Sequence, residues 1–152
     1  MRLKHQVALV LGLGIIFMPK IDKIPPIPTT ILESMASAMM HFEGWTSKSR
    51  AYRNKNPGNL KYAKQNGAVG KDKDGFAIFE TFKAGWDALL TQLRLAFTNK
   101  SHVYHNTMTL LEFFTKYTED NPKTKESEPL VYAEFIAARL GASLNTQLRH
   151  LK

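Results

Sequence analysis

Residues 30–45 read Thr-Ile-Leu-Glu-Ser-Met-Ala-Ser-Ala-Met-Met-His-Phe-Glu-Gly-Trp, and this stretch determines how the domain begins. Thr30 and Glu33 have the T-x-x-E spacing of a capping box, which predicts a helix that starts at Ile31. Apolar residues then recur at helical spacing, and Gly44 is placed to end the helix as its left-handed residue. The apolar stripe consists of Leu32, Met35, Ala36 and Met39.

Glu43 falls on the same stripe, four residues after Met39, in the last turn of the predicted helix. A carboxylate at this place faces the core and lies against the negative end of the helix dipole. Both effects oppose ionisation, so we expect the pKa of Glu43 to be raised. A carboxyl group that keeps its proton near neutral pH is suited to general acid catalysis. The competing interpretation is a solvent-exposed glutamate at a frayed helix end.

The segment Arg53-Asn54-Lys55-Asn56-Pro57-Gly58-Asn59-Leu60 predicts a sharp, rigid loop. Pro57 and Gly58 suit the two central positions of a type II turn. The asparagines of the loop could bond backbone groups and hold its shape, or could contact the hydroxyl and N-acetyl groups of a sugar. The pattern leaves both roles open.

A small β-hairpin is expected next. Residues 60–63 and 76–79 have the pattern of two short strands, joined by a polar stretch that contains several glycines. Phe76 and Phe79 alternate faces of the second strand, and we expect Phe76 to face a cleft between the hairpin and the helices while Phe79 packs. Asp72, in the connecting stretch, is interpreted as part of a solvated loop tip.

Three helices and a short closing one complete the predicted domain. The first is capped by Thr81, the second starts with a capping box at Thr109 and ends at Asn121-Pro122, and the third runs from about Glu128 to Leu140. A short helix from Asn145 ends the chain. The residues expected to face the core are Phe82, Trp86, Leu89, Leu93, Phe97, Leu110, Phe113, Phe114, Tyr117, Val131, Phe135 and Ala138. This order describes an α+β domain that is mainly α-helical.

The composition describes one soluble domain that is stabilised by packing alone. The chain has 152 residues, 43% hydrophobic content and no cysteine, which excludes disulfides and thiolate metal sites. Its formal charge of +8 favours polyanionic surroundings. The basic residues are scattered and no nucleic-acid-binding spacing is present, so nucleic acid is not an expected partner. The histidines have no metal-ligand spacing, and no metal or other cofactor is expected.

The N-terminal segment 1–24 has the pattern of an export signal or membrane anchor. Arg2 and Lys4 precede an apolar run from Val7 to Met18, and no small-x-small cleavage triplet follows. We expect an uncleaved or late-released anchor that associates with the inner membrane, which implies a periplasmic or cell-envelope location. The alternative is a buried N-terminal helix of the domain. A proline-rich linker, residues 25–29, then separates this segment from a domain at 30–152.

Four segments, in this order and spacing, resemble the lysozyme-like domains of phage and bacterial peptidoglycan lyases. They are Phe42-Glu43-Gly44-Trp45, Arg53-Asn54-Lys55-Asn56-Pro57-Gly58-Asn59-Leu60, Gly75-Phe76-Ala77-Ile78-Phe79 and Ala84-Gly85-Trp86. The segments Tyr117-Thr118, Tyr132-Ala133 and Leu140-Gly141 look like the closing helices of the same domains. The resemblance covers roughly Ile31 to Leu151, and the asparagine-rich loop is its most specific part. It implies a goose-type-lysozyme or lytic-transglycosylase fold with the hairpin beside a catalytic cleft.

The resemblance implies that the domain cleaves the β-1,4 bond between N-acetylmuramic acid and N-acetylglucosamine in peptidoglycan. Glu43 has the position of the family's catalytic glutamate. Because no second catalytic carboxylate can be placed, the resemblance favours a lytic transglycosylase, in which one glutamate is both acid and base. The alternatives are a hydrolytic muramidase, such as a lysozyme or endolysin, and a non-catalytic wall-binding or virion structural module. We expect a monomer whose partner is the glycan strand.

The expected substrate-binding residues lie on the segments that carry the resemblance. They are Trp45, Asn56, Asn59, Phe76 and Tyr117. Trp45 could stack on a sugar ring or cover the helix end. A tyrosine bonds the catalytic glutamate in the transglycosylases that this chain resembles, and we expect Tyr117 to take that role, with Tyr132 in the core.

Overall fold

The computed structural model describes residues 30–119 and 128–152. The predicted anchor 1–24, the linker 25–29 and the helix end at Asn121-Pro122 lie outside these residues. Over the described ranges the chain is an α+β domain, mainly α-helical, with a two-stranded antiparallel sheet, as the sequence predicts. None of the helices in these ranges is long and apolar enough to cross a membrane.

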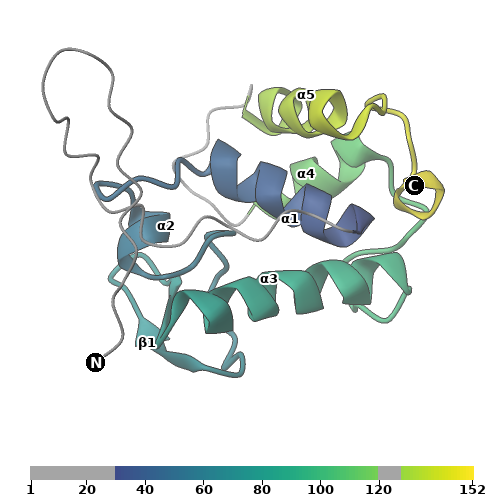
Figure 1. Cartoon of the computed structure of the whole chain (residues 1–152). Helices are drawn as coiled ribbons and strands as arrows, with labels where there is room; N and C mark the ends of the chain where they lie inside the picture. The colour runs from purple at the N-terminus through teal and green to yellow at the C-terminus, as the bar shows by residue number, and fades with distance from the viewer. Residues whose placement is uncertain (1–29, 120–127) are drawn as a thin grey trace, which may run out of the picture.

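The helices pack as layers around α1. In chain order the elements are α1 (Ile31–Phe42), α2 (Arg50–Arg53), β1 (Ala68–Lys71), β2 (Ala77–Phe79), α3 (Phe82–Phe97), α4 (Leu110–Thr118), α5 (Glu128–Leu140) and the 3-10 helix η1 (Leu148–His150). α1 packs against α3 on one side and α5 on another, and α4 packs against α5. Figure 1 shows α1 in the middle of the molecule, with α2 and β1 together at one end.

The helix α1 begins and ends as its sequence predicts. The hydroxyl oxygen of Thr30 accepts a hydrogen bond from the backbone N–H of Glu33 at 3.2 Å, and the Glu33 carboxylate accepts one from the N–H of Thr30 at 3.1 Å. Gly44 has a φ of 73°, the left-handed conformation that ends a helix. The buried residues are Met35, Ala36, Ala38, Met39 and Met40. Glu43 therefore emerges at the end of a helix that is embedded in the core.

The predicted hairpin exists, but its first strand is not residues 60–63. β1 pairs with β2 instead, with Ala68 opposite Phe79. Residues 60–63 form only an isolated bridge, between Lys61 and Phe76. Asn59 and Lys64, with φ of 48° and 57°, are left-handed on either side of this segment, which stops it from continuing as a strand. The sequence pattern does not reveal these two non-glycine left-handed residues.

The helix α5 has its predicted bounds but buries a different face. Val131 is 50% exposed, whereas Tyr132 on the next position is 2% exposed. The aromatic ring of Tyr132 stacks on Phe42 at 3.8 Å and on Phe114 at 4.4 Å between centroids. These rings from α1 and α4 select the face that α5 buries, because apolar residues occur nearly all round this helix. The closing helix also begins later than predicted, as the 3-10 turn at Leu148–His150.

Candidate active site

A cavity of about 440 Å³ lies at the end of α1, bounded by the loop after α2 and by α3, α4 and α5. This is within the size range of small-molecule sites. Residues from seven separate parts of the chain meet there. Those that carry polar or aromatic groups important to the site are Glu43, Asn59, Phe76, Tyr117, Glu128 and Tyr132.

Two hydrogen bonds fix the carboxyl group of Glu43 in the cavity. The phenol of Tyr132, on α5, donates to one carboxyl oxygen at 3.0 Å. The side-chain amide of Asn59, on the loop after α2, donates to the other oxygen at 2.6 Å. Each oxygen thus has its own donor, and the donors come from segments 16 and 89 residues away in sequence. The carboxyl plane is held in one orientation.

The environment of Glu43 favours its protonated form. Burial raises the pKa of Glu43, while the hydrogen bonds from Asn59 and Tyr132 and the charge of Arg50 lower it and the charge of Glu128 raises it. The net effect is a pKa above the ordinary value of a glutamate. This direction agrees with the expectation from the apolar stripe, and it keeps a proton available for donation.

Asn56 holds the loop and does not reach the cavity. Its side chain is fully buried, and its amide nitrogen donates to the backbone oxygens of Leu60 and Ala77, both at 2.9 Å. Its amide oxygen accepts the backbone N–H of Leu60 at 2.9 Å. Of the two roles considered for the loop asparagines, Asn56 has the one that holds the shape of the loop, because its amide groups bond the protein backbone.

The turn at Pro57-Gly58 also differs from the prediction. The backbone N–H of Asn59 bonds to the oxygen of Asn56 at 3.0 Å, which closes the turn. Gly58 lacks the positive φ that a type II turn needs, and the left-handed conformation falls on Asn59 instead. A Cβ on Gly58 would lie 2.8 Å from Leu89 and 3.1 Å from the hydroxyl of Tyr117, so the glycine serves close packing.

Tyr132, not Tyr117, bonds the glutamate. Tyr117 lines the cavity, but its hydroxyl donates to the backbone oxygen of Gly58 at 2.5 Å. It thereby supports the loop that carries Asn59. Burial and the charge of Glu43 raise the pKa of Tyr132 well above its ordinary value, so its hydroxyl stays protonated and can donate. The sequence places Tyr132 in the core, and its stacked ring is indeed buried. Its hydroxyl, however, bonds Glu43 in the cavity.

Phe76 lines the cavity and Phe79 does not, as expected from their alternation along the strand. The ring of Phe76 is only 3% exposed, however, because two cations cover it. The guanidinium carbon of Arg50 lies 4.0 Å from the ring centroid and the amine of Lys61 lies 3.9 Å from it. Phe76 therefore holds the side chains of Arg50 and Lys61 in place through its ring. Of these two, Arg50 lowers the pKa of Glu43 by its charge.

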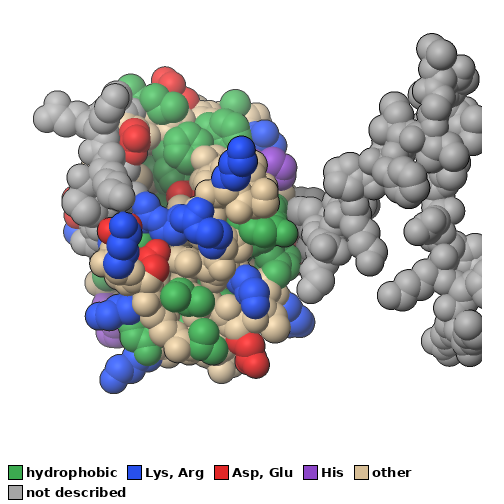
Figure 2. All heavy atoms as spheres, turned by 90° about the vertical axis from the view of Figure 1, so that its left-hand side faces the viewer, with side chains coloured by type: hydrophobic (Ala, Val, Ile, Leu, Met, Phe, Trp, Pro, Cys, Tyr) green, Lys and Arg blue, Asp and Glu red, His purple; other side chains and the backbone are tan. Residues whose placement is uncertain are grey.

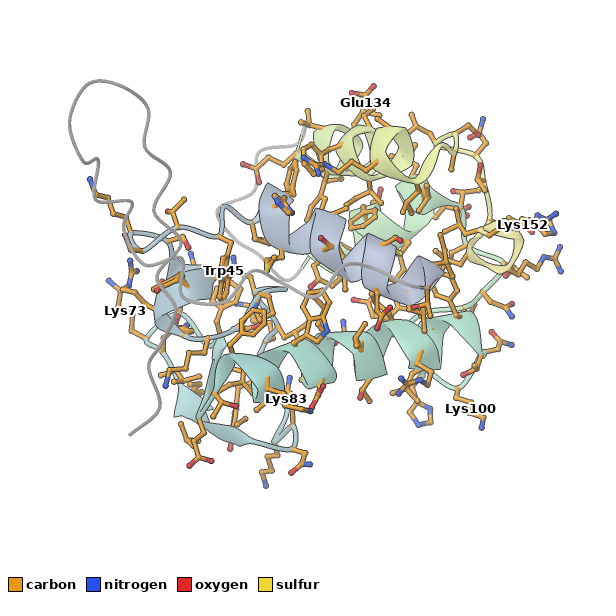
Figure 3. The ribbon with its side chains drawn as sticks, in the orientation of Figure 1. Trp45, Lys73, Lys83, Lys100, Glu134 and Lys152 are labelled. Atoms are coloured by element: carbon orange, nitrogen blue, oxygen red, sulfur yellow. The ribbon has the colours of Figure 1, made fainter. Side chains whose placement is uncertain are left out.

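Trp45 lies away from the cavity. Its ring packs against Tyr52 at 5.2 Å and against Phe82 at 5.1 Å between centroids. Figure 3 shows it beside α2 and near the start of α3. Trp45 therefore packs between α2 and the start of α3 and does not line the cavity around Glu43.

Asp72 is more than a solvated loop tip. It accepts hydrogen bonds from the amide of Asn54 at 2.8 Å and from the backbone N–H groups of Asp74 and Phe76, both at 2.9 Å. Partial burial raises the pKa of Asp72, but these hydrogen bonds outweigh it and leave the pKa below its ordinary value. Asp72 thus ties the loop after α2 to the turn of the hairpin. It does not line the cavity.

Glu128, at the start of α5, is the carboxylate that sequence reasoning missed. It lines the cavity with Glu43, whereas Asp72, Asp74 and Glu80 do not. No pattern around Glu128 distinguishes it from an ordinary glutamate in the first turn of a helix. Among residues 30–119 and 128–152, no three histidine or acidic side chains lie close enough together to hold a metal ion.

Comparisons with protein-family models, curated proteins and solved structures give no significant match to this chain.

Proposed function

We propose that this chain is a lytic transglycosylase that cleaves the β-1,4 bond between N-acetylmuramic acid and N-acetylglucosamine in peptidoglycan. The observation that carries the proposal is the carboxyl group of Glu43. It lies in a cavity, burial raises its pKa, and Tyr132 and Asn59 fix its orientation. A positioned carboxyl group with a raised pKa is what general acid catalysis of glycoside cleavage requires.

In the first step Glu43 donates its proton to the glycosidic oxygen, and the bond from that oxygen to the muramyl C1 breaks. The glutamate becomes a carboxylate, which the donors of Tyr132 and Asn59 stabilise. In the second step this carboxylate takes the proton of the muramyl C6 hydroxyl, whose oxygen bonds to C1. The product has a 1,6-anhydromuramyl end, Glu43 regains its proton, and no water is consumed.

The charge distribution supports an acidic polymer as substrate. Basic residues are spread along the whole chain, and eight of them lie between residues 48 and 73, a stretch that includes α2 and β1. These eight are Lys48, Arg50, Arg53, Lys55, Lys61, Lys64, Lys71 and Lys73. Figure 2 looks onto the end of the molecule where α2 and β1 lie, and Lys and Arg side chains cross the middle of that face. The stem peptides of peptidoglycan carry carboxylates, which such a face attracts.

Hydrolysis is the second candidate, and Glu128 favours it. A muramidase that hydrolyses the same bond uses two carboxyl groups, one as acid and one to activate water or to attack the sugar. Glu128 lines the cavity together with Glu43, and its charge acts on the pKa of Glu43. In this mechanism the released muramyl unit has a reducing end.

Mass spectrometry of the muropeptides released from purified sacculi separates the two reactions. We expect 1,6-anhydromuramyl ends, which are lighter than reducing ends by one water. We also expect Glu128→Gln to keep the anhydro product, because transglycosylation needs only Glu43. Reducing ends that disappear in Glu128→Gln would establish the hydrolase instead. Binding to sacculi without any release would assign the chain to the non-catalytic wall-binding class.

Replacing Tyr132 by Phe should lower kcat/KM by about tenfold, the size expected for one hydrogen bond to a charged group. The variant keeps the ring that stacks on Phe42 and Phe114 and loses only the donor to Glu43. Because this donor lowers the pKa of Glu43, its loss raises that pKa and moves the alkaline limb of the pH–rate profile to higher pH. The control is Tyr52→Phe, at a tyrosine outside the cavity, which should match the wild type. An unchanged profile in Tyr132→Phe would contradict the assigned role.

A further inference from the structure

The backbone of Asn59 is left-handed. Its φ is 48°, a value that asparagine adopts more readily than other residues except glycine. This conformation directs the amide nitrogen to the carboxyl oxygen of Glu43 at 2.6 Å, the shorter of the two bonds that Glu43 accepts. The backbone conformation of Asn59 thus places its side chain against Glu43.

The loop that carries Asn59 is held from several sides. The side chain of Asn56 bonds the backbone of Leu60, just after the turn, and of Ala77 on β2, and Tyr117 donates to the oxygen of Gly58. Gly58 itself packs against Leu89, where no Cβ would fit without a shift. These contacts leave the backbone of Asn59 little freedom. With the backbone held, the amide group of Asn59 can still turn about the Cβ–Cγ bond.

The amide of Asn59 has one atom engaged and one free. Its oxygen is buried and has no hydrogen-bond partner among residues 30–119 and 128–152. An amide presents a donor on one side and an acceptor on the other. A carboxylate needs a donor from its neighbour, whereas a protonated carboxyl group needs an acceptor for its O–H. A half-turn of the amide exchanges one for the other, and either orientation makes one bond to Glu43 and leaves one amide atom unpaired.

We propose that Asn59 is a positioning residue that pairs with both protonation states of Glu43. It donates through its nitrogen to the carboxylate and, after a half-turn of the amide, accepts through its oxygen from the carboxylic acid. This inference rests on the proposed function, in which Glu43 alternates between acid and base within one turnover. A partner that bonds both states keeps the carboxyl group in one orientation through both proton transfers.

Among residues 30–119 and 128–152, Asn59 is the side chain that bonds the Oε2 atom of Glu43. Arg50 and Lys61 are cations that can only donate. Glu128, on α5, acts on Glu43 by charge, and Tyr117, on α4, gives its hydroxyl to Gly58. Tyr132 bonds the other carboxyl oxygen. The side chains that α3 contributes to the cavity do not titrate; they are Ala88, Thr91, Gln92 and Leu95.

The test compares Asn59→Gly with Asn59→Ala. Both remove the amide, but glycine adopts the left-handed conformation freely whereas alanine is strained there. We expect both variants to lower kcat/KM by about tenfold, the loss expected for one hydrogen bond to a charged group. The alkaline limb of the pH–rate profile should stay near its wild-type position, because the proposed partner is lost from the acid as well as from the carboxylate. A shift of this limb to higher pH would show that Asn59 bonds the carboxylate alone and would overturn the proposal. If Asn59 only shapes the loop, Asn59→Gly will keep the wild-type rate, and the proposal is overturned.

NMR titration of the wild-type protein tests the pairing without any need for turnover. The ¹³C signal of the Glu43 carboxyl group and the side-chain amide signals of Asn59 should shift with the same midpoint, and the amide signals should not shift at that pH in Glu43→Gln. In Asn59→Gly the Glu43 midpoint should stay near its wild-type value, and a clear rise would show that Asn59 bonds the carboxylate alone. If the amide signals of Asn59 do not change as Glu43 titrates, the pairing is refuted, even if the enzyme is active. A protein that shows the common midpoint but releases no muropeptide would refute the proposed function and leave the pairing intact.

Discussion

Replacing Glu43 by Gln should lower the release of muropeptides from sacculi by about 10³-fold or more, within the range that general acid–base catalysis contributes. Glutamine keeps the length and shape of the side chain. Its amide oxygen can accept from Tyr132, and its nitrogen can donate to Asn59 once the Asn59 amide presents its oxygen. What it loses is the transferable proton, which both steps of the proposed reaction use. Few other single substitutions in this cavity should remove so much activity while preserving the contacts.

The same variant makes a prediction about stability and pH. Burial raises the pKa of Glu43 in the folded protein above its unfolded value. A group of this kind favours folding fully at pH below its unfolded pKa, and this contribution is lost as the pH rises through the folded pKa. Glutamine has no such dependence. The melting temperature of Glu43→Gln relative to wild type should therefore be higher at pH 8 than at pH 4, which thermal unfolding at the two pH values measures.

Glu80→Gln is the matched control for Glu43→Gln. Glu80 is exposed, lies beside the hairpin and does not line the cavity. The same chemical change there should leave muropeptide release at the wild-type level. Full activity of Glu43→Gln, or an equal loss in both variants, would remove Glu43 from the mechanism. Because hydrolysis and transglycosylation both need the acid, this experiment tests cleavage itself and leaves the product analysis to separate the two reactions.

The features that the sequence predicts well are those that neighbouring residues determine. The capping boxes at Thr30 and Thr109 bond groups three residues apart, so their spacing alone predicts where α1 and α4 begin. The burial of Glu43 follows in the same way, because helical spacing puts it on the face of Met39. These local rules also predict its raised pKa, which the surroundings of the folded chain support.

The features that the sequence does not predict depend on packing between distant segments. Tyr117 and Tyr132 are both aromatic residues on predicted core faces, and nothing local tells which hydroxyl reaches Glu43. The choice follows from the ring stack that Tyr132 forms with residues of α1 and α4. Glu128 enters the cavity because of where α5 begins in space, for which its own neighbours in sequence give no signal.

Gly85 is the residue that brings the longest helix of the described chain against the loop that carries Asn59. A Cβ built on Gly85 would lie 1.9 Å from the backbone oxygen of Lys55 and 3.0 Å from the ring of Pro57. Neither obstacle is a flexible side chain. Glycine inside a helix costs roughly 1 kcal/mol relative to alanine, so its presence in α3 has to be explained by this close approach.

Gly85→Ala should therefore destabilise the domain by about 3 kcal/mol, the upper part of the range for overpacking, despite the better helix propensity of alanine. For a chain of this size that corresponds to a melting temperature lower by roughly 6–12 °C. The control is Gly70→Ala in β1, where a Cβ would meet nothing within 4 Å and the change should stay within about 0.5 kcal/mol.

Muropeptide release by the Gly85→Ala protein shows whether α3 has moved away from the loop to accommodate the added methyl group. If α3 moves away from the loop, Asn59 moves relative to Glu43, and the variant should lose muropeptide release at temperatures where circular dichroism shows it folded. A melting temperature equal to that of Gly70→Ala would show that the helix and the loop are not in close contact. The loop and the helix therefore depend on each other, because Gly85 in α3 leaves the room that the backbone of the loop at Lys55 and Pro57 occupies. This contact determines where Asn59, the partner of Glu43, lies.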